Sequence, residues 1–304
     1  MKIVAIVITY NGKKAWYNQC FQSLLNQSVP VHVLAIDNSS TDDSVDYIRQ
    51  HFPQVELIAS ETNLGFAKAN NIGLKYALEH DADYALLLNH DAWFESTDGV
   101  EQMVRIASQH PEYWILAPLQ VYASSGRIEA EVQRHIFRSH TPQSDYISDA
   151  TNGCVKDCYP IEYACAYCWL MPISTVRTIG GFDPLFYHYG EDDNYQQRVR
   201  YHGGRVAFCP KVRVAHDIEG RSEKHREQNL DWRKYLLIQY GDVNMSWNVY
   251  THLRRLVKKI LIEALRLQRK HLRLSVPEWK YLHSVRKELH HSREQNKQKG
   301  TNWL

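Results

Sequence analysis

The sequence contains no apolar stretch that approaches the ~20 residues needed to span a membrane. We also expect no signal peptide, because Lys2 is followed at once by a strand-like apolar run. The 304 residues, 44% of them hydrophobic, suffice for one large folded domain with an extension, which excludes wholesale disorder. We therefore expect a folded, cytoplasmic protein.

Two common nucleotide-binding motifs are missing as well. No G-x-G-x-x-G follows the first predicted strand, and no G-x-x-x-x-G-K-[ST] occurs anywhere in the chain. These motifs supply the glycine-rich loops that cradle the phosphates of dinucleotides and nucleoside triphosphates. The sequence therefore gives no support for a dinucleotide-binding or P-loop enzyme.

Cysteine is scarce, with six residues in the chain. Cys154, Cys158, Cys165 and Cys168 follow C-x3-C and C-x2-C spacing, which raises the question of zinc. However, Cys165 and Cys168 lie in an apolar, strand-like run, where strand alternation would point them to opposite faces. We favour buried thiols in a reducing compartment over a structural zinc site.

The formal net charge of +2 conceals a division of charge along the chain. The first 220 residues carry 17 Lys and Arg against 26 Asp and Glu, whereas the last 84 carry 19 against 8. Such asymmetry predicts a separate basic element, and we place the boundary between residues 1–222 and residues 223–304. Nucleic acid and an anionic membrane surface are the two classes of partner that suit it.

Strand and helix signals alternate over the first ninety residues. Four apolar runs are typical of buried parallel strands, at residues 2–9, 31–36, 55–59 and 84–88. Helical spacing follows at residues 13–27 and 66–79, and Thr41 is placed to cap a helix between them. This order predicts an α/β fold with a mainly parallel central sheet.

Polar side chains follow each of these strands, at the edge where ligands bind in such sheets. The four segments are Thr9-Tyr10-Asn11, Asp37-Asn38-Ser39, Asn63-Leu64-Gly65 and Asn89-His90-Asp91. Each segment alone is consistent with an ordinary turn or helix cap. Four of them at one edge predict a binding site.

These segments resemble glycosyltransferase family 2, and most of all its rhamnosyltransferase-like, single-addition branch. Gly180-Gly181-Phe182-Asp183 and Gly190-Glu191-Asp192-Asp193 extend the resemblance, which ends near His216. It implies a GT-A fold, to which the basic region adds a C-terminal α-helical extension. It also implies inverting transfer of a sugar from a UDP- or dTDP-linked donor. The acceptor would be a hydroxyl group of a glycan or a lipid-linked molecule, in bacterial cell-surface polysaccharide synthesis.

The resemblance assigns a donor site. Asp37 would contact the base or ribose, and the segment after the third strand would pack under the nucleotide and sugar. There Gly65 would allow close backbone approach, and Lys68 would either contact the diphosphate or remain a solvated helix lysine. The expected donor-site residues are Thr9, Tyr10, Asn11, Asp37, Asn38, Ser39, Asn63, Gly65, Lys68, Asn70 and Asn89.

Asn89-His90-Asp91 occupies the place of the family's D-x-D metal motif. The resemblance therefore implies that Asp91 and His216 hold a divalent cation, Mg²⁺ or Mn²⁺. The alternatives to a metal site are a capped turn at Asp91 and a structural role for His216.

The segment Gly190-Glu191-Asp192-Asp193 places three carboxylates side by side. Their mutual repulsion predicts that at least one has a raised pKa. By resemblance to the family's E-D motif, Asp192 is the general base and Glu191 its neighbour, which contacts the acceptor or the structure. The alternative is a solvated acidic helix start.

Residues 249–274 predict one basic amphipathic helix with a leucine-rich stripe. The stripe suits docking on the catalytic domain, a homodimer contact, or peripheral binding to the inner face of the cell membrane. The sequence does not decide between these partners. Residues 293–304 are expected to be frayed.

Other functions stay open at this point. A sugar nucleotidyltransferase lacks support, because no Gly-rich basic loop follows the first strand. A processive synthase is disfavoured because Q-x-x-R-W is missing. Nucleic acid is not an expected partner, since the first 220 residues are acidic and no recognition motif is present. A catalytically inactive sugar-nucleotide binder remains the alternative to an enzyme.

Overall fold

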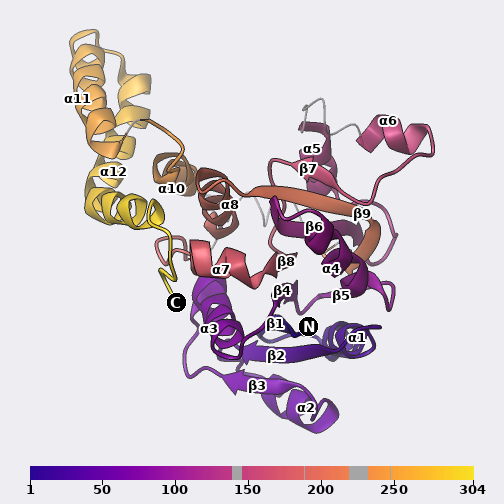
Figure 1. Ribbon diagram of the computed structural model, residues 1–304. Coiled ribbons are helices and arrows are strands. Elements are labelled where there is room, and N and C mark those ends of the chain that lie inside the picture. Colours follow the sequence, from indigo (N-terminus) through magenta and orange to yellow (C-terminus); the bar gives the residue numbers. More distant parts are fainter. Residues whose placement is uncertain (139–145, 188, 219–231, 247) are drawn as a thin grey trace.

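The computed structural model describes residues 1–138, 146–187, 189–218, 232–246 and 248–304. Over these residues, nine strands form one mixed sheet in the order β3-β2-β1-β4-β8-β6-β9-β5, with β7 paired to β9. Figure 1 shows helices on both sides of the sheet and a pair of long helices projecting from it. The expected α/β class is confirmed.

The first half of the sheet is parallel, as predicted. Its strands are β1 (Ile3–Thr9), β2 (Val31–Asp37), β3 (Glu56–Ala59) and β4 (Tyr84–Asn89). The helices that connect them are α1 (Lys14–Leu25), α2 (Ser44–His51) and α3 (Gly65–Glu79). The expectation that Thr41 caps the second helix is wrong, because Asp43 is the N-cap residue. The Thr41 amide instead donates to Asn11 Oδ1.

The second half of the sheet mixes directions. Its strands are β5 (Ala92–Phe94), β6 (Tyr113–Tyr122), β7 (Tyr159–Ile161), β8 (Cys168–Pro172) and β9 (Arg205–His216). β8 runs antiparallel to β4 and β6, whereas β6 and β9 are parallel. The apolar run around Cys165 becomes a strand only at Cys168, so Cys165 lies in the preceding loop.

The remaining helices cover the sheet or follow it. They are α4 (Gly99–Gln109), α5 (Ala130–Arg138), α6 (Tyr146–Thr151), α7 (Ile173–Ile179), α8 (Glu191–Tyr201), α10 (Trp232–Gly241), α11 (Val249–Leu265) and α12 (Arg269–Asn296).

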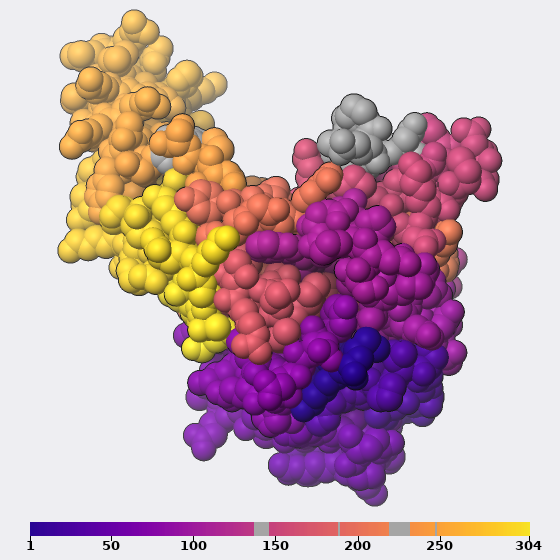
Figure 2. Space-filling view, in the orientation of Figure 1, coloured from indigo at the N-terminus to yellow at the C-terminus, as the bar shows by residue number. Residues whose placement is uncertain are grey.

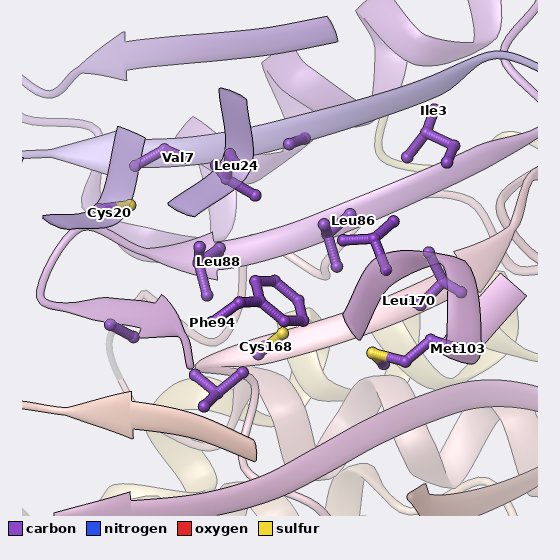
Figure 3. Packing of buried hydrophobic residues seen from close by; sticks show 14 of the residues in the cluster. Ile3, Val7, Cys20, Leu24, Leu86, Leu88, Phe94, Met103, Cys168 and Leu170 are labelled. Atoms are coloured by element: carbon purple, nitrogen blue, oxygen red, sulfur yellow. The ribbon is translucent and has the colours of Figure 1, made fainter. Parts of the chain in front are cut away.

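Strand alternation builds two cores from β1. Ile3 and Val7 pack in one cluster with side chains of α1 and α4, whereas Val4 and Ile6 pack in the other with α3, α7 and α8. Figure 3 shows the first cluster, where Leu24 of α1 and Met103 of α4 lie near the strand side chains. Because both faces are covered, the strand sequences are continuously apolar.

The C-terminal region forms a helical hairpin, which corrects the prediction of one helix over residues 249–274. The break follows Leu265, and Leu267 adopts a φ of 53°, which an α-helix does not allow. Leu253 and Leu256 of α11 pack with Leu282 and Leu289 of α12. The predicted domain boundary between residues 222 and 223 lies outside the described residues. No helix among the described residues is both long and apolar enough to cross a bilayer.

The expectation that residues 293–304 are frayed is wrong. Asp183 Oδ2 accepts hydrogen bonds from Ser292 Oγ at 2.5 Å and from Asn296 Nδ2 at 2.8 Å. The Gly181 amide donates to the carbonyl group of Asn302 at 2.8 Å. The C-terminal end is therefore ordered because it docks on the motif at residues 180–183.

Candidate active site

The ends of β1 and β2 are joined around one buried carboxylate. Thr9 and Asp37 are partners in the sheet, and the Thr9 hydroxyl donates to Asp37 Oδ1 at 3.1 Å. The Ser40 amide donates to Oδ2 at 2.8 Å, and its hydroxyl donates to Oδ1 at 2.5 Å. Asp37 is only 1% exposed. In this structure Asp37 therefore organises the strand ends, and its contact with a nucleotide stays a prediction.

The loop after β1 is tied to the same edge by Asn11. This residue has a φ of 44°, and its amide donates to Ser40 Oγ at 3.0 Å. Its side-chain oxygen accepts from the Thr41 amide at 2.8 Å. Tyr10 is left 44% exposed beside these contacts, so its ring is accessible to a ligand.

The loop after β3 is bound to the end of β2 by paired amides. Asn38 Nδ2 donates to Asn63 Oδ1 at 3.1 Å, and Asn38 Oδ1 accepts from the Leu64 amide at 2.7 Å. The Ser39 hydroxyl donates to the Glu61 carbonyl oxygen at 3.3 Å. The structure thus brings together the expected residues at three strand ends.

Gly65 begins α3 with a φ of +74°, where a Cβ atom would lie 2.8 Å from the carbonyl oxygen of Tyr187. The close approach expected at Gly65 is therefore made by the protein's own backbone. Lys68 is exposed on α3. Asn70 is 1% exposed and donates to the Phe66 carbonyl oxygen of its own helix, so it lies inside the protein and not on the binding edge.

Sequence reasoning missed Asn71, the next residue on α3. Its side chain donates to the carbonyl groups of Phe182 at 2.8 Å and Trp303 at 3.0 Å, and accepts from the Phe182 amide at 2.6 Å. Asn71 therefore joins α3 to the Gly-Gly-Phe-Asp motif and to the C-terminal end. Nothing in the local sequence distinguishes it from Asn70.

Asp91 follows the end of β4, and its side chain contacts that of His216 at the end of β9. β5 pairs Ala92 with His216, which places Asp91 Oδ1 3.2 Å from His216 Nε2. Both are buried, with 4% and 7% of their surfaces exposed. Nowhere in the described ranges do three His, Cys, Asp or Glu side chains converge to hold a metal ion. Among the described residues, Asp91 and His216 are thus a pair that could supply two ligands to the expected cation.

The surroundings of His216 fit such a role. Gln120 Nε2 lies 2.5 Å from His216 Nδ1, while Gln120 Oε1 is buried with no hydrogen-bond partner among the described residues. Turning the amide over would let Oε1 accept a hydrogen bond from the Nδ1–H group, which leaves the Nε2 lone pair for a cation beside Asp91. One carboxylate and one imidazole suit Mn²⁺, and the carboxylate suits Mg²⁺.

The acidic cluster stands at the first turn of α8. Burial raises the pKa of Asp192, although hydrogen bonds from Tyr163 and from backbone amides oppose this rise. Burial, followed by the charge of Asp192, raises the pKa of Glu191 to about 8 and that of Asp193 to about 7. The prediction of a raised pKa in this cluster is confirmed. Asn194, the next residue on α8, is fully buried.

The loop at residues 163–167 links the two constellations and was not anticipated from the sequence. The Tyr163 hydroxyl donates to Asp192 Oδ2 at 2.5 Å. The Tyr167 ring stacks on His216 with centroids 5.5 Å apart, and the Tyr167 carbonyl oxygen accepts from the Asn89 amide at 2.8 Å. One short loop therefore positions the expected base and the expected metal ligand together.

The fold and this polar edge define a sugar-nucleotide transferase fold of the GT-A type. The structure of S. aureus TarS in complex with UDP is similar, with a TM-score of 0.57 at 15% sequence identity over 82% of this chain and 67% of that one. Residues 4–172, more than half of the chain, match the sequence model of glycosyl transferase family 2. The chain belongs to this family.

Two curated relatives are rhamnosyltransferases. The N-acetylglucosaminyl-diphospho-decaprenol L-rhamnosyltransferase of Mycobacterium tuberculosis is 24% identical over 62% of this chain and 66% of its own length. The O-antigen chain rhamnosyltransferase WbaN of Salmonella anatum is 24% identical over 73% of this chain and 68% of its own length. The chain thus spans about two thirds of the length of these relatives.

Proposed function

We propose that this protein is an inverting glycosyltransferase that moves a rhamnosyl or hexosyl group from a nucleoside diphosphate sugar to a hydroxyl group of a lipid-linked glycan. Family membership and the names of the relatives support sugar transfer to such an acceptor. The observation that carries the mechanism is the loop at residues 163–167, which contacts both Asp192 and His216.

The donor would lie along the edge formed by the ends of β1, β2 and β4. The exposed ring of Tyr10 offers a surface for the base, next to Asn11. Asp91 and His216 would hold the divalent cation at the diphosphate. A bound cation would neutralise the negative charge that develops on the leaving diphosphate.

Asp192 would act on the acceptor. The acceptor oxygen attacks the anomeric carbon, its proton passes to the Asp192 carboxylate, and the bond from the anomeric carbon to the diphosphate oxygen breaks. One displacement with one base inverts the configuration of the sugar. A pKa raised by burial strengthens Asp192 as a base, because catalytic efficiency increases as the pKa approaches the working pH.

The acceptor would lie beside α5, whose side chains contact the loop at residues 163–167. The ring of His135 lies 4.4 Å from that of Tyr163, between centroids, and Ile136 of the same helix lines a small apolar cavity with Tyr163. A segment that touches the partner of the base is well placed to contact an acceptor. This placement supports the proposal that residues around α5 determine which acceptor is used.

The experiment that tests the proposal mixes the full chain, Mg²⁺ or Mn²⁺, a panel of UDP- and dTDP-linked sugars and a polyprenyl-diphosphate-linked N-acetylglucosamine acceptor. We expect one donor to be consumed and a glycosylated acceptor with inverted anomeric configuration to form. Donor binding without transfer or hydrolysis would identify an inactive binder. Release of pyrophosphate from a nucleoside triphosphate and a sugar phosphate would identify a nucleotidyltransferase.

A further inference from the structure

The far end of the α11–α12 hairpin exposes large apolar side chains, which we call the hairpin-tip residues. They are Leu261, Ile262, Leu265, Leu267 and Leu274, with 59%, 48%, 85%, 80% and 75% of their surfaces exposed. Earlier on α11, Leu253 and Leu256 are buried against α12. The apolar stripe of α11 is therefore divided between a part that closes the hairpin and a part that faces away from the protein.

The same end of the hairpin is strongly cationic. Residues 249–277 contain eight Lys and Arg but a single acid, Glu263. All eight cationic side chains are exposed, whereas Glu263 is 3% exposed and accepts a hydrogen bond from Ser275 Oγ at 3.3 Å. The exposed surface of this end of the hairpin therefore carries leucines and cations, while its one acidic side chain is buried.

We propose that the hairpin tip is a membrane-surface anchor that inserts its leucines among the headgroups of anionic lipids. Aliphatic side chains surrounded by Lys and Arg match the apolar interior and the negative surface of such a membrane at once. Nucleic acid would pair with the cations alone, and residues 257–274 contain no Phe, Trp or Tyr on which bases stack.

The anchor would also orient the catalytic body. α12 runs from the tip to the docking site at Asp183, where Ser292 and Asn296 bind the same carboxylate oxygen. Figure 1 shows the α11–α12 turn at the end of the hairpin that points away from the sheet. Figure 2 shows the surface hollowed between this hairpin and the part of the protein that carries α6. A membrane bound at the tip would therefore hold this hollow in a fixed relation to lipid-linked substrates.

The test is co-sedimentation of the full chain with vesicles of phosphatidylcholine alone or with phosphatidylglycerol added. We expect binding only to the anionic vesicles, weakened by 0.5 M salt because exposed charges are screened. The double variant Leu265→Gln and Leu267→Gln should bind at least about tenfold more weakly, because it loses the two leucine side chains that would move from water into the membrane. The matched control, Ile147→Gln with Met245→Gln, removes exposed apolar side chains elsewhere and should bind like the wild type.

Two results would overturn the anchor. One is wild-type binding to vesicles by the leucine variant. The other is a wild-type chain that does not bind anionic vesicles. If that wild-type chain is a dimer and the leucine variant is a monomer, a second copy of the chain covers the hairpin tip. Vesicle binding requires no sugar transfer, so these outcomes are independent of the proposed function.

Discussion

Tyr163 donates a hydrogen bond from its hydroxyl group to Oδ2 of Asp192 across 2.5 Å. This contact stabilises the charged carboxylate and so opposes the effect of burial on the pKa of Asp192. Burial raises the pKa of Tyr163 well above its usual value, which keeps the hydroxyl group protonated as the donor. Tyr163 is therefore a positioning residue that sets both the direction and the basicity of the expected base.

Tyr163→Phe should move the acid limb of the kcat/KM profile to higher pH. Removing the donor raises the pKa of Asp192 further, so a higher pH is needed to ionise the base. Turnover on the alkaline plateau should change less. The control is Tyr167→Phe, which removes a hydroxyl group that donates to the Pro118 carbonyl oxygen and not to Asp192. An acid limb that stays in place in Tyr163→Phe would show that the contact does not tune the base.

Asp91→Asn should abolish metal-dependent donor binding. An amide keeps the shape of the side chain but loses the negative charge that a hard divalent cation prefers. Titration calorimetry of donor with and without Mn²⁺ measures the loss, and EDTA should have the same effect on the wild type. Asp46→Asn, on the exposed surface of α2, is the control and should bind normally. Full activity in EDTA would contradict the metal assignment.

Gly65→Ala should destabilise the fold more than Gly153→Ala. Both glycines have positive φ values, +74° and +70°, where an L-residue costs roughly 1–2 kcal/mol. Only at Gly65 would the new Cβ atom also meet backbone, because nothing lies within 4 Å of Gly153. Urea denaturation should therefore show an additional loss of about 1–3 kcal/mol in the free energy of unfolding at Gly65. Equal losses of unfolding free energy in the two variants would mean that Tyr187 moves away from the new Cβ atom at little cost.

Stability should fall as the pH rises from about 5 to 8, and Glu191→Gln should make that fall shallower. The native pKa of Glu191 is raised to about 8, so in this window the native state holds a proton that the unfolded state has lost. Thermal melts at several pH values measure the slope, with the exposed Glu79→Gln as control. An unchanged slope in Glu191→Gln would contradict the raised pKa.

Much of the catalytic fold follows from local sequence pattern. The strands are continuously apolar because both sheet faces are covered, and parallel order brings the strand ends to one edge. Tyr163 could not be predicted in its role, because the loop that carries it has no periodicity and its partner is 29 residues away. The docking of Ser292 on Asp183 joins residues 109 apart, and no local signal marks such a contact. Long-range hydrogen bonds therefore account for most of what the sequence did not reveal.

Asp192 is proposed to remove the proton of the acceptor hydroxyl group, and the turnover of Asp192→Asn tests this role most directly. Asparagine is nearly isosteric but cannot take up a proton at neutral pH. With donor affinity unchanged by calorimetry, kcat should fall about 10²–10⁴-fold, the usual contribution of a general base. Asp193→Asn, the matched change one residue along α8, should lose much less. Near-wild-type turnover by Asp192→Asn would contradict the mechanism.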